Sequence, residues 1–264
     1  MILDTLAAAS KNRALAAKMF VSMWEMEKLA FQVYEKTKDQ TPSFEQALSS
    51  PDISFICEVK RASPSKGLIA PDFPYVDIAK DYEAAGANAI SVLTEPEYFL
   101  GRNDYLTEIS REVSIPLLRK DFTVDPYQIY EAKVIGASAV LLICALLDTK
   151  ALREGIELCD KLGLSALVEA HDEEEIHSAL EAGARIIGVN NRNLKTFEVD
   201  FNNSIRLRSL VPPDVLFVAE SGIKTDDDIR QLSEAGVNAV LIGESLMRSP
   251  DKKEIISGFK RAAR

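Results

Sequence analysis

The sequence is poor in the residues that build metal sites and disulfide frameworks. It has three cysteines (Cys57, Cys144 and Cys159), none of them in a C-x-x-C pair, and two histidines (His171 and His177) that stand six positions apart. Two histidines on one helix bind zinc when they are four positions apart, so we predict no metal site. The cysteines fall in apolar or helical stretches, which indicates reduced core residues of a cytoplasmic protein.

Long apolar runs and an excess of positive charge are also missing. No stretch reaches the roughly 18 uninterrupted apolar residues of a membrane-spanning helix, and the early charges Asp4 and Lys11 argue against a signal peptide. The 31 Lys and Arg are outnumbered by 41 Asp and Glu, which gives a net charge of −10. Because an acidic protein repels nucleic acids and anionic membranes, neither is predicted as a partner. An anionic ligand would need a local cluster of cations.

From residue 53 onward, short apolar runs alternate with amphipathic helical stretches. The runs predict strands at 53–60, 89–93, 115–120, 139–143, 165–169, 186–190, 215–220 and 239–243. Several of the intervening helices end in a glycine, which accepts the left-handed turn of a tight connection. Eight such units predict an α/β fold, the TIM (β/α)8 barrel. An open doubly wound sheet is the alternative, but no G-x-G-x-x-G follows the first strand.

The first 50 residues have helical spacing instead. We predict an N-terminal helical extension over residues 1–50 that packs on a catalytic barrel of residues 51–264, with breaks at 41–43 and 49–51. The extension carries a stripe of methionine and aromatic residues that we interpret as a docking face, with a lid over the site as the alternative. The stripe consists of Met19, Met23, Trp24, Met26 and Phe31.

Charged side chains interrupt the apolar pattern at the ends of the predicted strands. Glu58 and Lys60 stand two positions apart and therefore share one face of the first strand. For this pair alone, a structural ion pair is the simplest explanation. Other strands also end in polar or charged residues, namely Lys120, Glu169, Asn190, Glu220 and Ser221. Barrel enzymes carry their active residues at the carboxyl ends of strands, and unmatched buried charges are costly, so we predict a catalytic site.

The last two predicted strands end in glycine-bearing loops. Ser221-Gly222 follows the seventh strand, and Gly243-Glu244 follows the eighth, where a short helix is predicted to begin. In many barrels these loops bind phosphate through backbone N–H groups. We expect the same here, with the Glu244 carboxylate pointing away from the anion. Plain turn glycines are the alternative.

Six blocks of sequence resemble the indole-3-glycerol-phosphate synthase family of tryptophan biosynthesis, as does the opening Met1-Ile2-Leu3-Asp4. The blocks are EVKRASPSKG (58–67), LRKDF (118–122), VEAHDEEE (168–175), GVNNRNLKTFEVD (188–200), VAESGI (218–223) and IGESLMR (242–248). The resemblance implies a carboxy-lyase that closes 1-(2-carboxyphenylamino)-1-deoxyribulose 5-phosphate to indole-3-glycerol phosphate, with loss of carbon dioxide and water. It implies no metal and no organic cofactor.

The resemblance also implies roles for the strand-end residues. Lys120 is expected to be the acid for ring closure, kept protonated by the neighbouring Glu58 and Glu169. Glu169 is expected to be the acid and base of the dehydration, and Lys60 either holds the substrate carboxylate or donates the second proton.

The remaining implied roles concern substrate binding. Asn190, Glu220 and Ser221 are expected to position the sugar hydroxyls and intermediates, and Arg192 to face the anthranilate carboxylate. The other implied substrate-binding residues are Ser63, Pro64, Phe99, Phe122, Leu141, Gly222, Gly243 and Glu244.

Two other functions fit the strand-end residues and stay open at this point. A lysine among carboxylates also suits a Schiff-base aldolase, which borohydride trapping on Lys60 or Lys120 would favour. Glycine loops alone would suit a phosphate-binding barrel that forms no product. For any of these functions we expect a phosphorylated small-molecule ligand and a monomer in the cytoplasm.

Overall fold

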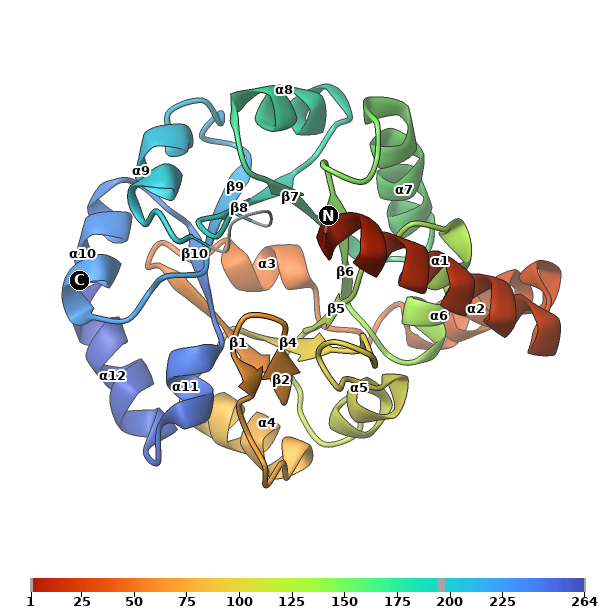
Figure 1. Cartoon of the computed structure of the whole chain (residues 1–264), viewed down its shortest axis with the longest axis horizontal. Helices are drawn as coiled ribbons and strands as arrows, with labels where there is room; N and C mark the ends of the chain where they lie inside the picture. Colours follow the sequence, from red (N-terminus) through yellow and green to blue (C-terminus); the bar gives the residue numbers. More distant parts are fainter. Residues whose placement is uncertain (1, 194–197, 264) are drawn as a thin grey trace.

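The computed structural model describes residues 2–193 and 198–263, in which eight parallel strands close into a barrel (Figure 1). The strand order around the barrel is β1-β10-β9-β8-β7-β6-β5-β4. The barrel strands are β1 (Ser54–Val59), β4 (Ala89–Leu93), β5 (Leu117–Lys120), β6 (Ala139–Ile143), β7 (Ser165–Ala170), β8 (Ile186–Asn190), β9 (Leu216–Glu220) and β10 (Ala239–Ile242). The predicted TIM barrel is therefore confirmed.

Helices cover the outside of the barrel (Figure 1). They are α4 (Tyr75–Ala84), α5 (Asn103–Ile109), α6 (Pro126–Val134), α7 (Thr149–Lys161), α8 (Glu173–Glu181), α9 (Asn202–Arg208), α10 (Asp226–Glu234), α11 (Glu244–Arg248) and α12 (Lys252–Ala262). Gly86, Gly136, Gly183 and Gly236 follow α4, α6, α8 and α10 with φ between 77° and 97°. This is the left-handed conformation expected where a helix turns back to the next strand.

Alternate strand residues fill the interior of the barrel and position the site. On β5, Leu118 points into the interior cluster, whereas the buried Arg119 pairs with Glu131 of α6 outside it. The same alternation along every strand fills the barrel interior with apolar side chains and places polar side chains at the carboxyl ends of the strands. The short helix α3 (Phe44–Leu48) closes the opposite end, where Phe44 and Leu48 are fully buried against the interior cluster.

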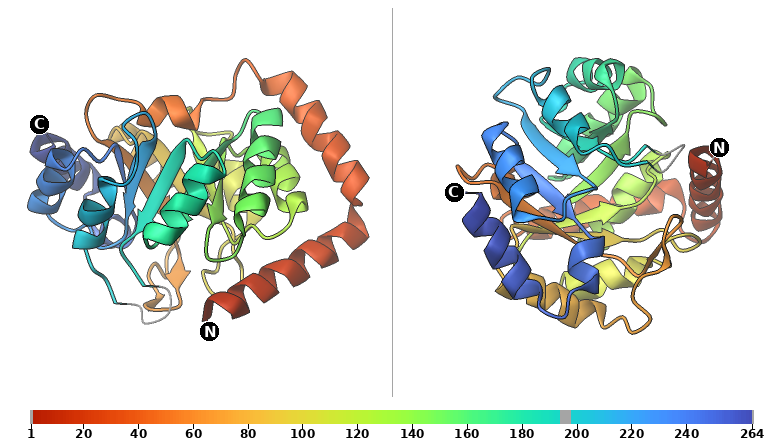
Figure 2. Two further views of the ribbon diagram at one scale, coloured as in Figure 1. Left: turned by 90° about the horizontal axis from the view of Figure 1, so that it is seen from above. Right: turned by 60° about the vertical axis from the view of Figure 1, so that its left-hand side comes forward.

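The first two helices bracket the barrel from one side (Figure 2). Helix α1 (Ile2–Phe20) crosses the end where the strands terminate, and α2 (Met23–Thr37) runs down the side, against α6. The corner between them is fixed by a capping box, in which Ser22 and Glu25 exchange hydrogen bonds.

The methionine and aromatic stripe divides between core and solvent. Met26 is buried, and Met23 and Phe31 pack against the core, as a docking face requires. Met19 and Trp24 lie at the outer corner and are 87% and 67% exposed. The docking interpretation therefore holds for part of the stripe. Within the described ranges, no helix is both long and apolar enough to cross a membrane.

Candidate active site

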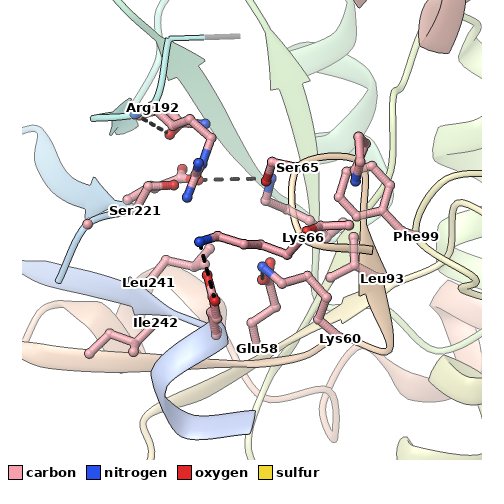
Figure 3. Close-up of a pocket in the computed structure, with 18 of the residues that line it drawn as sticks. Glu58, Lys60, Ser65, Lys66, Leu93, Phe99, Arg192, Ser221, Leu241 and Ile242 are labelled. Atoms are coloured by element: carbon pink, nitrogen blue, oxygen red, sulfur yellow. Dashed lines mark hydrogen bonds and ion pairs between the residues drawn. The ribbon is translucent and has the colours of Figure 1, made fainter. Parts of the chain in front are cut away.

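The carboxyl ends of the barrel strands surround a cavity of 550 Å³. Every site residue predicted from the sequence lines it: Glu58, Lys60, Ser63, Pro64, Phe99, Lys120, Phe122, Leu141, Glu169, Asn190, Arg192, Glu220, Ser221, Gly222, Gly243 and Glu244. Figure 3 shows Glu58 and Lys60 side by side on one wall, Arg192 and Ser221 across from them, and Phe99 with Leu93 on a third side. Residues 194–197 of the 188–200 block, and Met1, lie outside the described residues.

Lys120 lies at the centre of the charged residues. Its Nζ is 3.5 Å from Glu169 Oε2 and 4.0 Å from Glu220 Oε2. Burial alone would lower the pKa of Lys120, but the charges of the surrounding carboxylates outweigh burial and raise it. Lys120 is therefore a protonated ammonium group at neutral pH, able to donate a proton or a strong hydrogen bond.

The two carboxyl groups beside Lys120 are in opposite protonation states. Burial raises the pKa of Glu220 to about 8, and the charge of Glu169 adds to that effect. Burial also acts on Glu169, but Lys120 and His171 outweigh it and lower its pKa below the usual value. The shifts favour the ionised form of Glu169 and the neutral form of Glu220 at neutral pH. A pair of groups whose pKa values are pushed apart in this way is typical of acid–base catalysis.

A second ion pair stands on the β1 side of the cavity. Lys60 Nζ lies 2.5 Å from Glu58 Oε2, which confirms that the two side chains share one face of the strand end. Beyond Lys60 the chain turns through a small antiparallel hairpin, β2 (Ala62–Ser63) with β3 (Gly67–Leu68), where the sequence indicated only a loop. Pro64 and Ser63 reach the cavity from this hairpin.

The loops after β9 and β10, where the sequence predicts a phosphate site, both line the cavity. Ser221 and Gly222 have φ of 67° and 81°, so a residue with a side chain is held in the left-handed region. Such strain is found where function constrains the backbone. The Glu244 carboxylate lies 3.2 Å from Arg248 Nε and 3.8 Å from Lys66 Nζ. These two cations line the same end of the cavity, and the sequence patterns did not predict them.

Two aromatic rings form an apolar wall of the cavity, and one hydrogen-bond network holds the loops that carry them. The ring centroids of Phe99 and Phe122 are 6.1 Å apart. The backbone N–H of Phe99 donates to the buried carboxylate of Glu95, and that of Phe122 donates to Asp121. Arg13 of α1 donates to both carboxylates, at 3.1 Å to Glu95 and 2.7 Å to Asp121. Residues on the first helix thus hold the loops that carry both rings.

The sequence patterns missed this network and also missed the three apolar side chains that α1 adds to the cavity, Ile2, Leu3 and Leu6. They missed His171 too, which lies beside Glu169. A signal for His171 was present, because it follows Glu169 by two positions, the same spacing that linked Glu58 and Lys60. The contacts of Arg13 span more than 80 positions in sequence, and no local pattern carries them.

Lysine and buried glutamate side chains that face glycine-bearing loops at the mouth of a (β/α)8 barrel are typical of barrel enzymes that act on phosphorylated small molecules. The chain belongs to the indole-3-glycerol phosphate synthase family, whose model matches residues 3–259. It is 62% identical over 251 residues to the indole-3-glycerol phosphate synthase of Ruminiclostridium cellulolyticum, covering 95% of each chain. It is 52% identical to that of Lacticaseibacillus paracasei, covering 100% of each chain.

Among solved structures, the chain is similar to a crystal structure of 3-hexulose-6-phosphate synthase, with a TM-score of 0.65. The two chains are 13% identical, and the match covers 80% of this chain and 100% of the other. A likeness at this level of identity concerns the fold alone.

Proposed function

We propose that this chain closes 1-(2-carboxyphenylamino)-1-deoxyribulose 5-phosphate to indole-3-glycerol phosphate, releasing carbon dioxide and water, as a step of tryptophan biosynthesis. The observation that carries the proposal is the position of the Lys120 ammonium group, between an ionised Glu169 and a protonated Glu220, in a cavity that also holds the two glycine-bearing loops.

Ring closure needs a proton donor at the ketone of the substrate. As the aryl carbon that bears the carboxylate attacks the ketone carbon, the ketone oxygen gains a proton from Lys120 and becomes a hydroxyl. Loss of the carboxylate as carbon dioxide leaves its electron pair in the ring, which restores aromaticity. Lys120 suits the first step because it is protonated and enclosed, so its charge is poorly screened by water.

Dehydration needs a base and a second acid. Glu169 accepts the proton that the intermediate loses, because its pKa is held below the usual value and it is ionised. The leaving hydroxyl takes a proton and departs as water. Lys60 supplies that proton or holds the substrate carboxylate, and kinetics separates these roles. Lys60→Ala lowers kcat if the lysine is the acid and raises KM if it binds the carboxylate.

The other cavity residues position the substrate in this proposal. The buried Glu220 Oε1 makes no hydrogen bond within the described residues, so it is available to a substrate hydroxyl, whereas Glu169 Oε2 faces Lys120 Nζ at 3.5 Å. Asn190 and Ser221 lie at the ends of neighbouring strands, β8 and β9, for the same purpose. Arg192 matches the substrate carboxylate because a guanidinium group binds carboxylates with two parallel hydrogen bonds.

The two ends of the substrate differ in chemistry, and so do the two ends of the cavity. The aromatic ring packs between Phe99, Phe122 and Leu141, with Pro64 at the edge. The phosphate binds the backbone N–H groups of Gly222, Gly243 and Glu244, beside the cations of the neighbouring loops.

Imine chemistry fits the same cavity less well. A lysine that attacks a carbonyl must first be a free amine. The carboxylates around Lys120 raise its pKa and keep it protonated, and Lys60 is held in an ion pair with Glu58. These contacts favour proton transfer over a Schiff base.

The proposed organisation is a catalytic barrel of residues 51–264 with a helical extension of residues 1–50 packed on it. Three side chains of α1 support the packing of the extension on the barrel, because they contact residues that follow β4 and β5: Ser10, Arg13 and Lys18. We also propose a monomer, and a cytoplasmic location, which suits the free thiols of its three cysteines. Sedimentation at working concentration tests the monomer.

The experiment that tests the function is direct. The purified chain is mixed with 1-(2-carboxyphenylamino)-1-deoxyribulose 5-phosphate, and indole fluorescence is followed together with release of carbon dioxide. The proposal expects both signals at equal amounts. Binding of the substrate without fluorescence would favour the phosphate-binding barrel, and a borohydride-trapped adduct on Lys60 or Lys120 would favour an aldolase.

A further inference from the structure

His171 lies just beyond the end of β7, and acidic groups on two sides hold its ring in place. Its Nδ1 is 3.1 Å from Glu175 Oε2, and its Nε2 is 3.6 Å from Glu169 Oε1. The same Glu175 carboxylate accepts the backbone N–H of His171 at 2.7 Å. Asn203 of α9 donates to the His171 carbonyl oxygen. The imidazole therefore has one fixed orientation, with its free edge toward the proposed base.

The free edge of the ring is enclosed. The side chain of His171 is 18% exposed, and its Nε2 makes no hydrogen bond with any residue that the structure describes. Burying a ring nitrogen costs free energy unless the nitrogen makes a hydrogen bond or lies beside an opposite charge. The nearest acceptor is the Glu169 carboxylate, which already faces Lys120 on its other oxygen.

The groups that face His171 from neighbouring elements are mostly acidic. They are Glu169 from β7, Glu175 from α8 and Glu220 from β9, with Lys120 of β5 on the far side of Glu169. Burial would lower the pKa of His171, but the hydrogen bond to Glu175 and the nearby carboxylates outweigh burial and raise it. The surroundings thus favour the imidazolium form.

We infer that His171 is a positioning residue which, as an imidazolium held by Glu175, serves as a second cation beside Glu169 and keeps that carboxylate ionised. The cavity lining does not include His171, so its effect on a reaction passes through Glu169. The kinetic part of this inference rests on the proposed function, whereas the electrostatic part does not.

The inference predicts the direction of a pH shift. Removing the imidazolium takes one positive charge from Glu169, so Glu169 gains a proton at a higher pH than before. If Glu169 acts as the base, the acidic limb of the profile of kcat/KM against pH moves upward, by about one pH unit for a neighbouring charge. A purely structural loss would lower the rate at all pH values without moving the limb.

The electrostatic part can be tested without any turnover, because the chain has only two histidines. In a His177→Gln variant, the one remaining imidazole is followed by nuclear magnetic resonance during a pH titration. We expect a pKa for His171 above the ordinary value of about 6.5, and a decrease in Glu169→Gln and in Glu175→Gln. A pKa at or below the ordinary value that neither variant changes would overturn the inference, and two variants guard against misfolding of either one.

The kinetic part uses His171→Gln, with His177→Gln as the matched control, because His177 is an exposed residue of the adjoining helix. We expect the acidic limb of the kcat/KM profile to move to higher pH in His171→Gln and to stay in place in the control. An unmoved limb in His171→Gln would overturn the kinetic part. If the unmodified chain forms no product at any pH, the proposed function fails, and the titration still decides whether His171 and Glu169 are coupled.

Discussion

The α-carbon of Gly243 faces the carboxylate of Glu58, so the first and last strands of the barrel meet with no room for a side chain between them. A methyl group at this position would collide with Glu58 Oε2 and lie 3.0 Å from Lys60 Nζ. The glycine therefore lets the proposed phosphate loop approach the Glu58–Lys60 ion pair. This is the close backbone approach for which glycine is suited.

Gly243→Ala should therefore displace the ion pair and lower kcat/KM by about tenfold or more, since overpacking costs roughly 1–3 kcal/mol. Steady-state kinetics with the proposed substrate measures this. Gly258→Ala is the matched control, because a methyl group there meets Asp226 only at ordinary contact distance, 3.4 Å. Equal kinetics for both variants and the parent chain would show that the Gly243 contact does not matter.

Arg13 carries a second prediction, because it is the link from α1 to two buried carboxylates. Replacing Arg13 with Met leaves Glu95, whose side chain is 0% exposed, without its cation. The loss should reduce the free energy of unfolding by about 1–3 kcal/mol, the scale of a lost hydrogen bond to a charged group, because Glu95 keeps only its backbone N–H donors. Because Glu95 and Asp121 hold the loops of Phe99 and Phe122, the KM should rise as well.

Arg102→Met is the control for that variant. Arg102 forms an ion pair with Asp104 in which both side chains are more than 60% exposed, and such pairs contribute about 1 kcal/mol at most. Urea denaturation and substrate titration of both variants make the comparison. A loss of stability in Arg13→Met no larger than in Arg102→Met would contradict the role given to Arg13.

The raised pKa of Glu220 predicts how the stability of the folded chain depends on pH. Burial raises its pKa from the usual 4.5 to about 8 in the folded chain. Between these two values the folded state keeps a proton that the unfolded state has lost, so this group's contribution to stability decreases as pH rises through that window. Glu220→Gln removes the titrating group and keeps the shape of the side chain.

The stability of Glu220→Gln relative to the parent chain should therefore rise from pH 4.5 to about pH 8 and then level off. Urea denaturation of both chains at three or more pH values across this window gives the difference in free energy of unfolding. A difference that stays flat with pH, or that falls, would mean that Glu220 is not protonated in the folded chain.

Much of the fold could be predicted because the signals are local. Each predicted strand overlaps a barrel strand, and the start of β5 differs from the predicted one for a plain reason. The apolar run begins at Ile115, but Pro116 has no N–H to donate to a neighbouring strand, so the strand begins at Leu117. The same local chemistry placed Glu58, Lys120 and the other strand-end side chains at one mouth.

What could not be predicted depends on contacts between distant segments. The helix α3 resembles a short linker in sequence, yet its Phe44 and Leu48 are buried in the barrel interior and close the end opposite to the cavity. The corner at Ser22 has a local signature, a serine followed three positions later by Glu25, which the apolar pattern of the extension masked. The protonation of Glu220 depends on burial and on Glu169, and neither is visible before the barrel closes.

In the proposed reaction, Lys120 donates the proton that drives ring closure. The most direct test of this role is a single-turnover measurement of indole fluorescence for Lys120→Ala at saturating substrate, with Lys150→Ala as a control, because that lysine side chain is 81% exposed. We expect Lys120→Ala to bind the substrate but to form product roughly 10²–10⁴-fold more slowly than the parent chain, and Lys150→Ala to be unchanged. Product formation by Lys120→Ala within a few fold of the parent rate would contradict this role.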